Sequence, residues 1–262
     1  MRNWVVDLDG VMWRGKVPIA GSVEAVAALV AAGERVLFCT NNSVESGAHR
    51  AARLADQGVP PGCDVVTSAD AVALLVRPGE RVLVVGGAGL RAAVESVGAR
   101  AVAAADREAV GGEALHRGFD AVVVGLARDF DYAQLDRAQA AVRAGARLLA
   151  SNTDASYPGA DGLHPGCGSL VAAVEAASGC PAVSAGKPMA PMVELIRARL
   201  GAGAEGVVVG DRGETDGRLA EALGWPFGLV LSGVTRRDDL PLDVPVAAVA
   251  DDLAGLVAEM RR

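Results

Sequence analysis

The chain has 262 residues and a formal net charge of −7; 51% of its residues are hydrophobic and only 3% are aromatic. This length allows one large domain or two modest ones, with a core built mainly from Val, Leu and Ala. The negative charge and the lack of a long basic run argue against a nucleic-acid partner. No apolar run approaches the ~20 residues that span a membrane, so we expect no membrane partner.

The cysteines bear on metals and on the compartment. Four of them are widely spaced, without a CxxC pair or a Cys/His cluster, which argues against a zinc site: Cys39, Cys63, Cys167 and Cys180. The N-terminus also lacks the basic-then-apolar pattern of a signal segment. We therefore expect a cytoplasmic protein, because thiols stay reduced in that compartment.

Two carboxylates mark the end of the first predicted strand. The segment 3–8 reads as a short apolar strand that carries Asp7 near its end, and Asp9 and Gly10 follow. Side chains two positions apart share one face of an extended segment, and open α/β sheets bind ligands at the carboxyl ends of their strands. The two acids repel each other unless a cation or a proton mediates. Taken alone, a strand end followed by an Asp-Gly turn is the simpler alternative.

The next elements lead to a second polar strand end. Residues 11–16 form a predicted hairpin or flap that contains Trp13, and Ser22 is the predicted N-cap of the helix that follows. A buried strand over 35–40 then runs into the polar sequence Thr-Asn-Asn-Ser at 40–43.

The rest of the chain alternates predicted strands and helices, which favours a mostly parallel sheet. Ser68 is expected to cap the helix that follows a strand at 64–67. The remaining predicted elements are a helix at 46–57, a linker at 77–80, strands at 81–86, 121–125 and 147–150, helices at 132–143 and 169–177, a return linker at 180–186, a helix from Lys187 to about Leu200, and a strand at 206–209 before a final strand–helix alternation.

Four element boundaries carry the groups that phosphate chemistry requires: Asp7 with Asp9, Thr40 to Ser43, Lys187, and Asp211 with Asp216. Phosphoryl transfer needs an in-line nucleophile, neutralisation of the equatorial oxygens and protonation of the leaving group. A carboxylate can be the nucleophile. A second carboxyl can act as general acid and then as base for water.

The other groups complete such a site. Thr40 and the amides after it can donate hydrogen bonds to phosphate oxygens, and Lys187 near a helix N-terminus adds positive charge. Asp211 can form an all-oxygen Mg²⁺ site with Asp7. Taken alone, each stretch also fits an ordinary turn or a solvated lysine. Their joint occurrence, in order and at element boundaries, favours a functional site.

Through these motifs the sequence resembles the haloacid dehalogenase (HAD) superfamily of phosphatases, in its NagD-like or para-nitrophenyl phosphatase branch. The matching motifs are Asp7-Leu8-Asp9-Gly10-Val11, Thr40-Asn41-Asn42-Ser43, Gly186-Lys187-Pro188, and Gly210-Asp211-Arg212 with Thr215-Asp216. Further stretches match in the insert, at 123–126, 130–132, 151–154 and 165–169.

The resemblance implies an α/β fold, with a doubly wound parallel-sheet core and a smaller inserted α/β cap. The spacing agrees, because the 33 positions from Asp7 to Thr40 leave no room for a lid and the 147 positions from Thr40 to Lys187 hold one. A lid there can exclude water and contact the leaving group. We expect the core at 1–77 and 187–262 and the cap at 78–186.

The resemblance also implies a role for each motif residue. Asp7 is the expected nucleophile and Asp9 the general acid and base. The remaining roles are phosphate binding by Thr40, Asn41, Asn42 and Lys187, Mg²⁺ binding by Asp7, the backbone carbonyl of Asp9 and Asp211, and orientation of Lys187 or a metal-bound water by Asp216, with Glu214 as the competing acid.

At three positions the chain departs from the branch. Gly213 and Gly217 stand where bulky apolar residues are usual, so we expect a looser loop around the fourth motif. Ala127 stands where an aspartate is common after Gly-Leu. These departures bear on rate and specificity more than on reaction class.

Specificity is expected to lie in the cap and the flap. The cap loop that begins at Asp154 reaches towards the leaving group in related phosphatases. Tyr157 in this loop is predicted either to stack on or hydrogen-bond the leaving group, or to pack on the surface. Trp13 is predicted either to form a wall of the site or to pack under the lid.

Together these features predict a cytoplasmic, Mg²⁺-dependent phosphomonoester hydrolase that acts on a small phosphorylated substrate through an aspartyl-phosphate. Two alternatives remain, a phosphotransferase or mutase of the same superfamily and a non-catalytic binding or regulatory protein on this fold. Dimers through the lid are common in the family, so a homodimer is allowed. The sequence leaves the oligomeric state and the substrate open.

Overall fold

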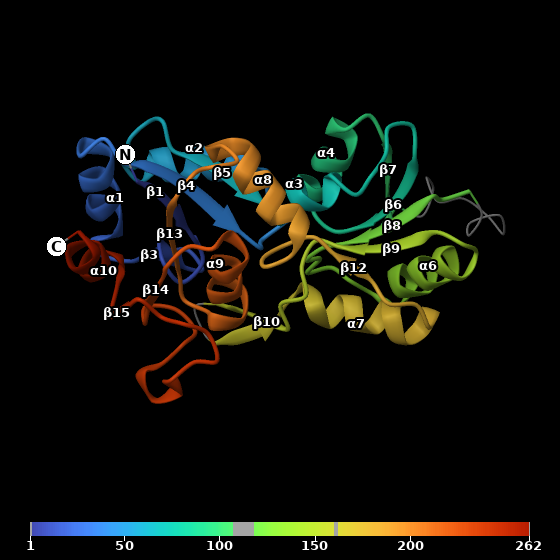
Figure 1. The fold of residues 1–262 in the computed structure, drawn as a ribbon. Coiled ribbons are helices and arrows are strands. Elements are labelled where there is room, and N and C mark those ends of the chain that lie inside the picture. Colours follow the sequence, from blue (N-terminus) through green and yellow to red (C-terminus); the bar gives the residue numbers. More distant parts are fainter. Residues whose placement is uncertain (1, 107–117, 160–161, 262) are drawn as a thin grey trace.

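The computed structural model describes residues 2–106, 118–159 and 162–261. Two parallel sheets dominate the fold, and Figure 1 shows the first in the left half of the molecule and the second in the right half. None of the helices in the described ranges is long and apolar enough to cross a membrane.

The larger sheet has six parallel strands in the order β15-β14-β13-β1-β4-β5. These are β1 (Asn3–Val6), β4 (Arg35–Thr40), β5 (Asp64–Thr67), β13 (Gly206–Gly210), β14 (Phe227–Val230) and β15 (Ala248–Ala250). Strand β1 pairs with β4 on one side and with β13 on the other. The chain order therefore reverses at β1, and the crevice at such a switch point is where open α/β sheets bind ligands.

Both faces of this sheet are covered, which confirms the predicted doubly wound core. Val5 points into one hydrophobic cluster, while Trp4 and Val6 point into the other. Such coverage explains why the strands read as continuous apolar runs. The helices of this part are α1 (Ser22–Ala31), α2 (Gly47–Asp56), α3 (Ser68–Ala73), α8 (Ala190–Leu200), α9 (Arg218–Leu223) and α10 (Leu253–Met260).

The smaller sheet has five parallel strands in the order β12-β9-β8-β6-β7. They are β6 (Arg81–Val85), β7 (Arg100–Ala103), β8 (Ala121–Val124), β9 (Arg147–Ala150) and β12 (Val183–Ser184), with helices α4 (Ala88–Ser96), α6 (Tyr132–Arg143) and α7 (Cys167–Ser178). The edge strand β12 lies inside the predicted return linker. We propose this α/β unit as the cap, with the limits at 78 and 186 given above.

Two short antiparallel hairpins complete the fold. The predicted flap is the hairpin of β2 (Trp13–Arg14) and β3 (Val17–Pro18). The other, of β10 (Ser156–Pro158) and β11 (Leu163–Pro165), extends from the second unit, and Figure 1 shows β10 below α9 of the first. A 3₁₀ turn, η2, spans Arg237–Asp239.

The prediction for Ser22 was wrong. Gly21, with φ of +81°, is the N-cap of α1, and Ser22 is the first helical residue. The Ser22 hydroxyl is buried and donates to the carbonyl of Val11 at 2.8 Å. Because Val11 is the last residue of the first motif and the first of the predicted flap, the hydroxyl anchors the flap rather than capping the helix.

Ser68 likewise is not a cap. Thr67 is the N-cap of α3 and forms a capping box with Asp70. The Ser68 hydroxyl instead donates to the carbonyl of Asn41 at 2.6 Å. It therefore holds the backbone of the second motif in place.

Candidate active site

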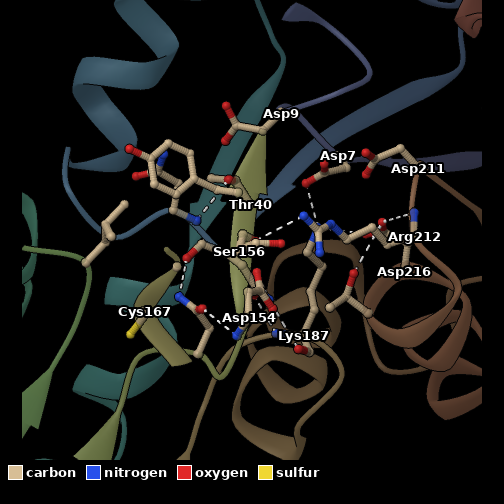
Figure 2. A pocket seen from close by; sticks show the side chains of 17 residues that line it. Asp7, Asp9, Thr40, Asp154, Ser156, Cys167, Lys187, Asp211, Arg212 and Asp216 are labelled. Atoms are coloured by element: carbon tan, nitrogen blue, oxygen red, sulfur yellow. Dashed lines mark hydrogen bonds and ion pairs between the residues drawn. The ribbon is translucent and has the colours of Figure 1, made fainter. Parts of the chain in front are cut away.

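Three buried carboxylates meet at the carboxyl ends of β1 and β13. Asp7 follows β1 and Asp211 follows β13, and these two strands are direct neighbours. Oxygen atoms of Asp7, Asp211 and Asp216 all lie within 4.8 Å of one another. Figure 2 shows the three side chains facing one another beside Lys187. The structure thus brings the first and fourth motifs together.

The ammonium of Lys187 lies among these acids. Its Nζ donates to Asp7 Oδ1 at 2.6 Å, to Asp216 Oδ1 at 2.7 Å and to the carbonyl of Cys39 at 3.1 Å, and the residue is buried. The predicted helix start is wrong by three residues, because α8 begins at Ala190. Lys187 therefore lies in the loop before α8.

The charges of this cluster do not balance by themselves. Burial raises the pKa of Asp7 well above its ordinary value, although Lys187 lowers it, and burial with the charge of Asp216 raises the pKa of Asp211 to about 7. Burial alone lowers the pKa of Lys187, but Asp216 and Asp7 outweigh this and raise it. Three carboxylates thus share one ammonium, and their all-oxygen donor set fits a hard divalent cation.

A π-helical turn, η1 (Gly213–Gly217), decides which acid of the fourth motif enters the site. The N–H groups of Asp216 and Gly217 both donate to the carbonyl of Arg212, at 3.0 and 3.2 Å. This winding directs Asp216 to Lys187, whereas Glu214 is exposed. Of the two acids left open by the sequence, the structure therefore places Asp216 in the cluster. Turns of this kind occur frequently at functional sites.

The looser loop expected at Gly213 and Gly217 is not found. A Cβ at Gly217 would lie 2.6 Å from Val244, and one at Gly213 would lie 3.0 Å from Leu242. These two side chains occupy the space that bulkier residues would take, so η1 is packed. The third departure, Ala127, lies buried in the hydrophobic core of the second unit, where an aspartate would be desolvated.

Asp9 lies at the pocket wall, but Trp13 does not. The indole Nε1 of Trp13 donates to Asp9 Oδ1 at 2.9 Å. The ring is fully buried, and the guanidinium of Arg53 covers it at 4.0 Å from the centroid. Of the two possibilities left open for Trp13, a wall of the site is therefore wrong, because the ring does not line the pocket and packs between the flap and α2.

The second motif turns its side chains towards the third motif and the cap. Asn41 Nδ2 donates to both carboxylate oxygens of Asp154, at 3.0 and 3.1 Å, and Asn41 Oδ1 accepts from the N–H of Lys187 at 2.8 Å. Thr40 Oγ1 accepts from the N–H of Asn42 at 3.1 Å. The side chain of Asn41 is thus a brace, and it links elements that are far apart in sequence.

Two cap residues reach the pocket as the sequence predicts, Asp154 and Tyr157. Burial raises the pKa of Asp154, which accepts from Asn41. The Tyr157 ring stacks on His164 with centroids 5.4 Å apart, so Tyr157 both lines the pocket and packs against a neighbouring ring.

Arg212 and Asn152 belong to the site through contacts that the sequence analysis missed. Arg212 Nη2 donates to the carbonyl of Ser156 in the cap at 3.0 Å, and Asn152 Nδ2 donates to the carbonyl of Asn41 at 2.6 Å. Both residues lie in matched motifs, which is the only signal the sequence offers for them.

These groups surround one pocket between the two units, which encloses a cavity volume of about 60 Å³. Its lining joins all four motifs to cap residues that include Leu126, Ser156, Tyr157 and Cys167. A parallel α/β sheet with an acid cluster and one buried lysine at its switch point, beside a second α/β unit that lines the same pocket, is typical of enzymes that act on phosphate esters.

Comparison with known proteins identifies the family. Residues 4–100 match the family described as haloacid dehalogenase-like hydrolase, and residues 184–256 match the HAD-hydrolase-like family. D-glycerol 3-phosphate phosphatase of Mycobacterium tuberculosis is 38% identical over 92% of this chain, which spans 66% of that protein's length.

Solved structures agree with this assignment. The structure of a glycerol phosphate phosphatase from M. tuberculosis in complex with magnesium has a TM-score of 0.83 and 37% identity, over 97% of this chain and 75% of that one. A 4-nitrophenylphosphatase from Thermotoga maritima has a TM-score of 0.84 and 28% identity, over 98% and 97%. The chain belongs to the haloacid dehalogenase-like hydrolases, among the phosphatases of the NagD-like and para-nitrophenyl phosphatase branch.

Proposed function

We propose that the protein is a Mg²⁺-dependent phosphomonoester hydrolase that acts on a small phosphorylated metabolite through an aspartyl-phosphate on Asp7. The observation that carries this proposal is the convergence of Asp7, Lys187, Asp211 and Asp216 in one buried cluster at the floor of the pocket. These residues come from segments separated by up to 209 positions, from Asp7 to Asp216. The pairing of β1 with β13 accounts for the meeting of Asp7 and Asp211, but not for the buried Lys187 and Asp216 beside them.

The donor set supports Mg²⁺ as the cofactor. Asp7, Asp211 and the backbone carbonyl of Asp9 would hold the ion, because the carboxylates of Asp7 and Asp211 lie close together and buried. A bound Mg²⁺ would neutralise charge on the phosphoryl oxygens. The relative solved with magnesium supports this proposal.

The positions of the side chains support the following reaction. A carboxylate oxygen of Asp7 attacks phosphorus while the ester P–O bond breaks, and Asp9 donates a proton to the departing oxygen. Asp9 then accepts a proton from water, which attacks the phosphorus of the aspartyl-phosphate. Inorganic phosphate leaves and the Asp7 carboxylate is restored.

The remaining groups bind and orient. Lys187 offsets negative charge on the phosphoryl group, and the Thr40 hydroxyl and the Asn41 N–H donate hydrogen bonds to its oxygens. Asp216 fixes the ammonium of Lys187 through the 2.7 Å contact. Asp154 and Tyr157 of the cap face the leaving group and restrict it to a small molecule.

The free cysteines support a cytoplasmic location, since all four are unpaired thiols. A homodimer through the cap stays a prediction from the family.

The test is a screen of phosphate esters, including para-nitrophenyl phosphate and glycerol 3-phosphate, with Mg²⁺ and with a chelator. We expect Mg²⁺-dependent release of inorganic phosphate without an added acceptor, which separates a hydrolase from a phosphotransferase. Asp7→Asn should abolish turnover with an unchanged circular dichroism spectrum, whereas Asp64→Asn, an exposed control, should retain it. Full activity of Asp7→Asn would falsify the assignment of the nucleophile.

A further inference from the structure

Two fully buried tryptophans each donate their indole N–H to a carboxylate, but only one of these carboxylates belongs to the site. Trp13 Nε1 donates to Asp9 Oδ1 at 2.9 Å, and Trp4 Nε1 donates to Glu34 at 3.2 Å. Glu34 lies outside the pocket, whereas Asp9 lines it. The pair of Trp13 and Asp9 therefore has a functional partner that the other pair lacks.

The backbone of the first motif brings this indole and this carboxyl together. The N–H of Gly10 donates to the carbonyl of Trp13 at 2.7 Å, and the N–H of Trp13 donates to the carbonyl of Leu8 at 3.3 Å. Gly10 has φ of +95°, and a Cβ there would lie 2.4 Å from Asp211 Oδ2. Only glycine fits this turn, which folds Trp13 back over Asp9.

A side chain of α2 also packs against the face of the indole ring. The Arg53 guanidinium lies 4.0 Å from the ring centroid, and its Nη2 donates to the carbonyl of Gly15 in the flap at 3.0 Å. A cation over an indole face is a favourable contact. The ring is fully buried, so its single N–H donor points in one fixed direction.

We propose that Trp13 is a positioning residue, whose N–H fixes the carboxyl of Asp9 in the orientation that serves the leaving group, and that Arg53 holds the ring in place. The proposal rests on the role proposed above for Asp9. The indole occupies Oδ1, so the proton passes between Oδ2 and the leaving group. The indole of Trp13 thus serves catalysis through Asp9 and not through the substrate.

The leaving group provides a readout that a purely structural role does not change. The alkoxide of glycerol needs a proton to depart, whereas 4-nitrophenolate departs as a stable anion. kcat/KM reports the steps up to the first irreversible one, which includes the departure of the leaving group. Loss of the orientation of Asp9 should therefore lower kcat/KM for glycerol 3-phosphate more than for para-nitrophenyl phosphate.

The variant is Trp13→Phe, which keeps an aromatic ring under Arg53 and loses the N–H. General acid catalysis contributes roughly 10²- to 10⁴-fold, so we expect kcat/KM to fall about 10- to 100-fold for glycerol 3-phosphate and less than about 3-fold for the aryl ester. Trp4→Phe is the matched control, because it loses the same kind of hydrogen bond outside the site. It should change both values less than about 2-fold.

A double-mutant cycle isolates the coupling. In an Asp9→Asn background, Trp13→Phe should lower kcat/KM by less than about 2-fold, because the group that it orients is gone. The proposal would be overturned if Trp13→Phe lowered kcat/KM equally for both substrates, or if it caused its full loss in the Asp9→Asn background. It would also be overturned if Trp4→Phe lowered kcat/KM as Trp13→Phe does. Should Trp13→Phe fail to fold, Arg53→Met keeps the indole and should show the same substrate dependence with a smaller loss.

These outcomes are distinct from a failure of the proposed function. Absence of phosphatase activity in the wild-type protein, or full activity of Asp9→Asn, contradicts the function assigned above. An active wild type and an impaired Asp9→Asn, together with an unimpaired Trp13→Phe, contradicts only the role of Trp13.

Discussion

The metal-free protein should become more stable as the pH falls from 8 to 6, contrary to the usual effect of a salt-bridged acid. The cause is Asp211, whose pKa burial and Asp216 raise from 3.8 to about 7. Between pH 3.8 and about 7 the folded state binds more protons than the unfolded state, so the free energy of unfolding falls as the pH rises through 7. The raised pKa of Asp7 acts in the same direction.

The size of the effect follows from the linkage relation. For a pKa of about 7 in the folded state and 3.8 in the unfolded state, Asp211 contributes on the order of 1 kcal/mol more stability at pH 6 than at pH 8. In a protein of this size, 1 kcal/mol corresponds to roughly 2–4 °C in Tm. We therefore expect Tm to be roughly 2–4 °C higher at pH 6.

Thermal unfolding in a chelator and in saturating Mg²⁺ measures this directly. Mg²⁺ binds the ionised acids, so it should raise Tm more at pH 8 than at pH 6. Asp211→Asn should lose most of the pH dependence in the chelator. If the metal-free wild type is more stable at pH 8, or if Asp211→Asn keeps the same pH dependence, Asp211 is not the acid with a raised pKa that an unbalanced cluster requires.

Two further predictions concern the fourth motif and the cap. Asp216→Asn should lower kcat about 10- to 100-fold because it frees the ammonium of Lys187, while the exposed Glu214→Gln should stay within about 2-fold; equal effects in steady-state assays would contradict the placement of Asp216 by η1. Asp154→Ala removes an acceptor of charge-assisted hydrogen bonds, each of about 1.5–3 kcal/mol, from Asn41. It should lower kcat/KM at least about tenfold, and an effect no larger than that of Asp129→Ala, an exposed cap control, would count against the link from core to cap.

The positions of the core acids follow from local information in the sequence. Asp7 and Asp211 each follow an apolar strand directly, and the carboxyl ends of neighbouring parallel strands must meet. The sequence did not predict strand β7 or helix α4, because Ala-rich stretches such as 99–105 show little hydrophobic periodicity.

Other contacts depend on how distant segments are oriented, which no local pattern encodes. Asn41 meets Asp154 across 113 positions, and their contact depends on how the cap lies over the core. The choice between Glu214 and Asp216 depends on a π-helical turn that shifts the register of the side chains. The sequence left open whether Trp13 forms a wall of the pocket or packs under the lid, because the answer depends on the flap, which buries the ring.

Trapping the phosphoryl group tests the proposed chemistry most directly. Asp9→Asn slows the attack of water, so rapid acid quenching of this variant with Mg²⁺ and para-nitrophenyl phosphate should leave one phosphoryl group on the protein. Peptide mass spectrometry should place that group on Asp7, and Asp7→Asn should carry none. A quenched protein without phosphate, or with phosphate on another residue, would show that Asp7 is not the acceptor.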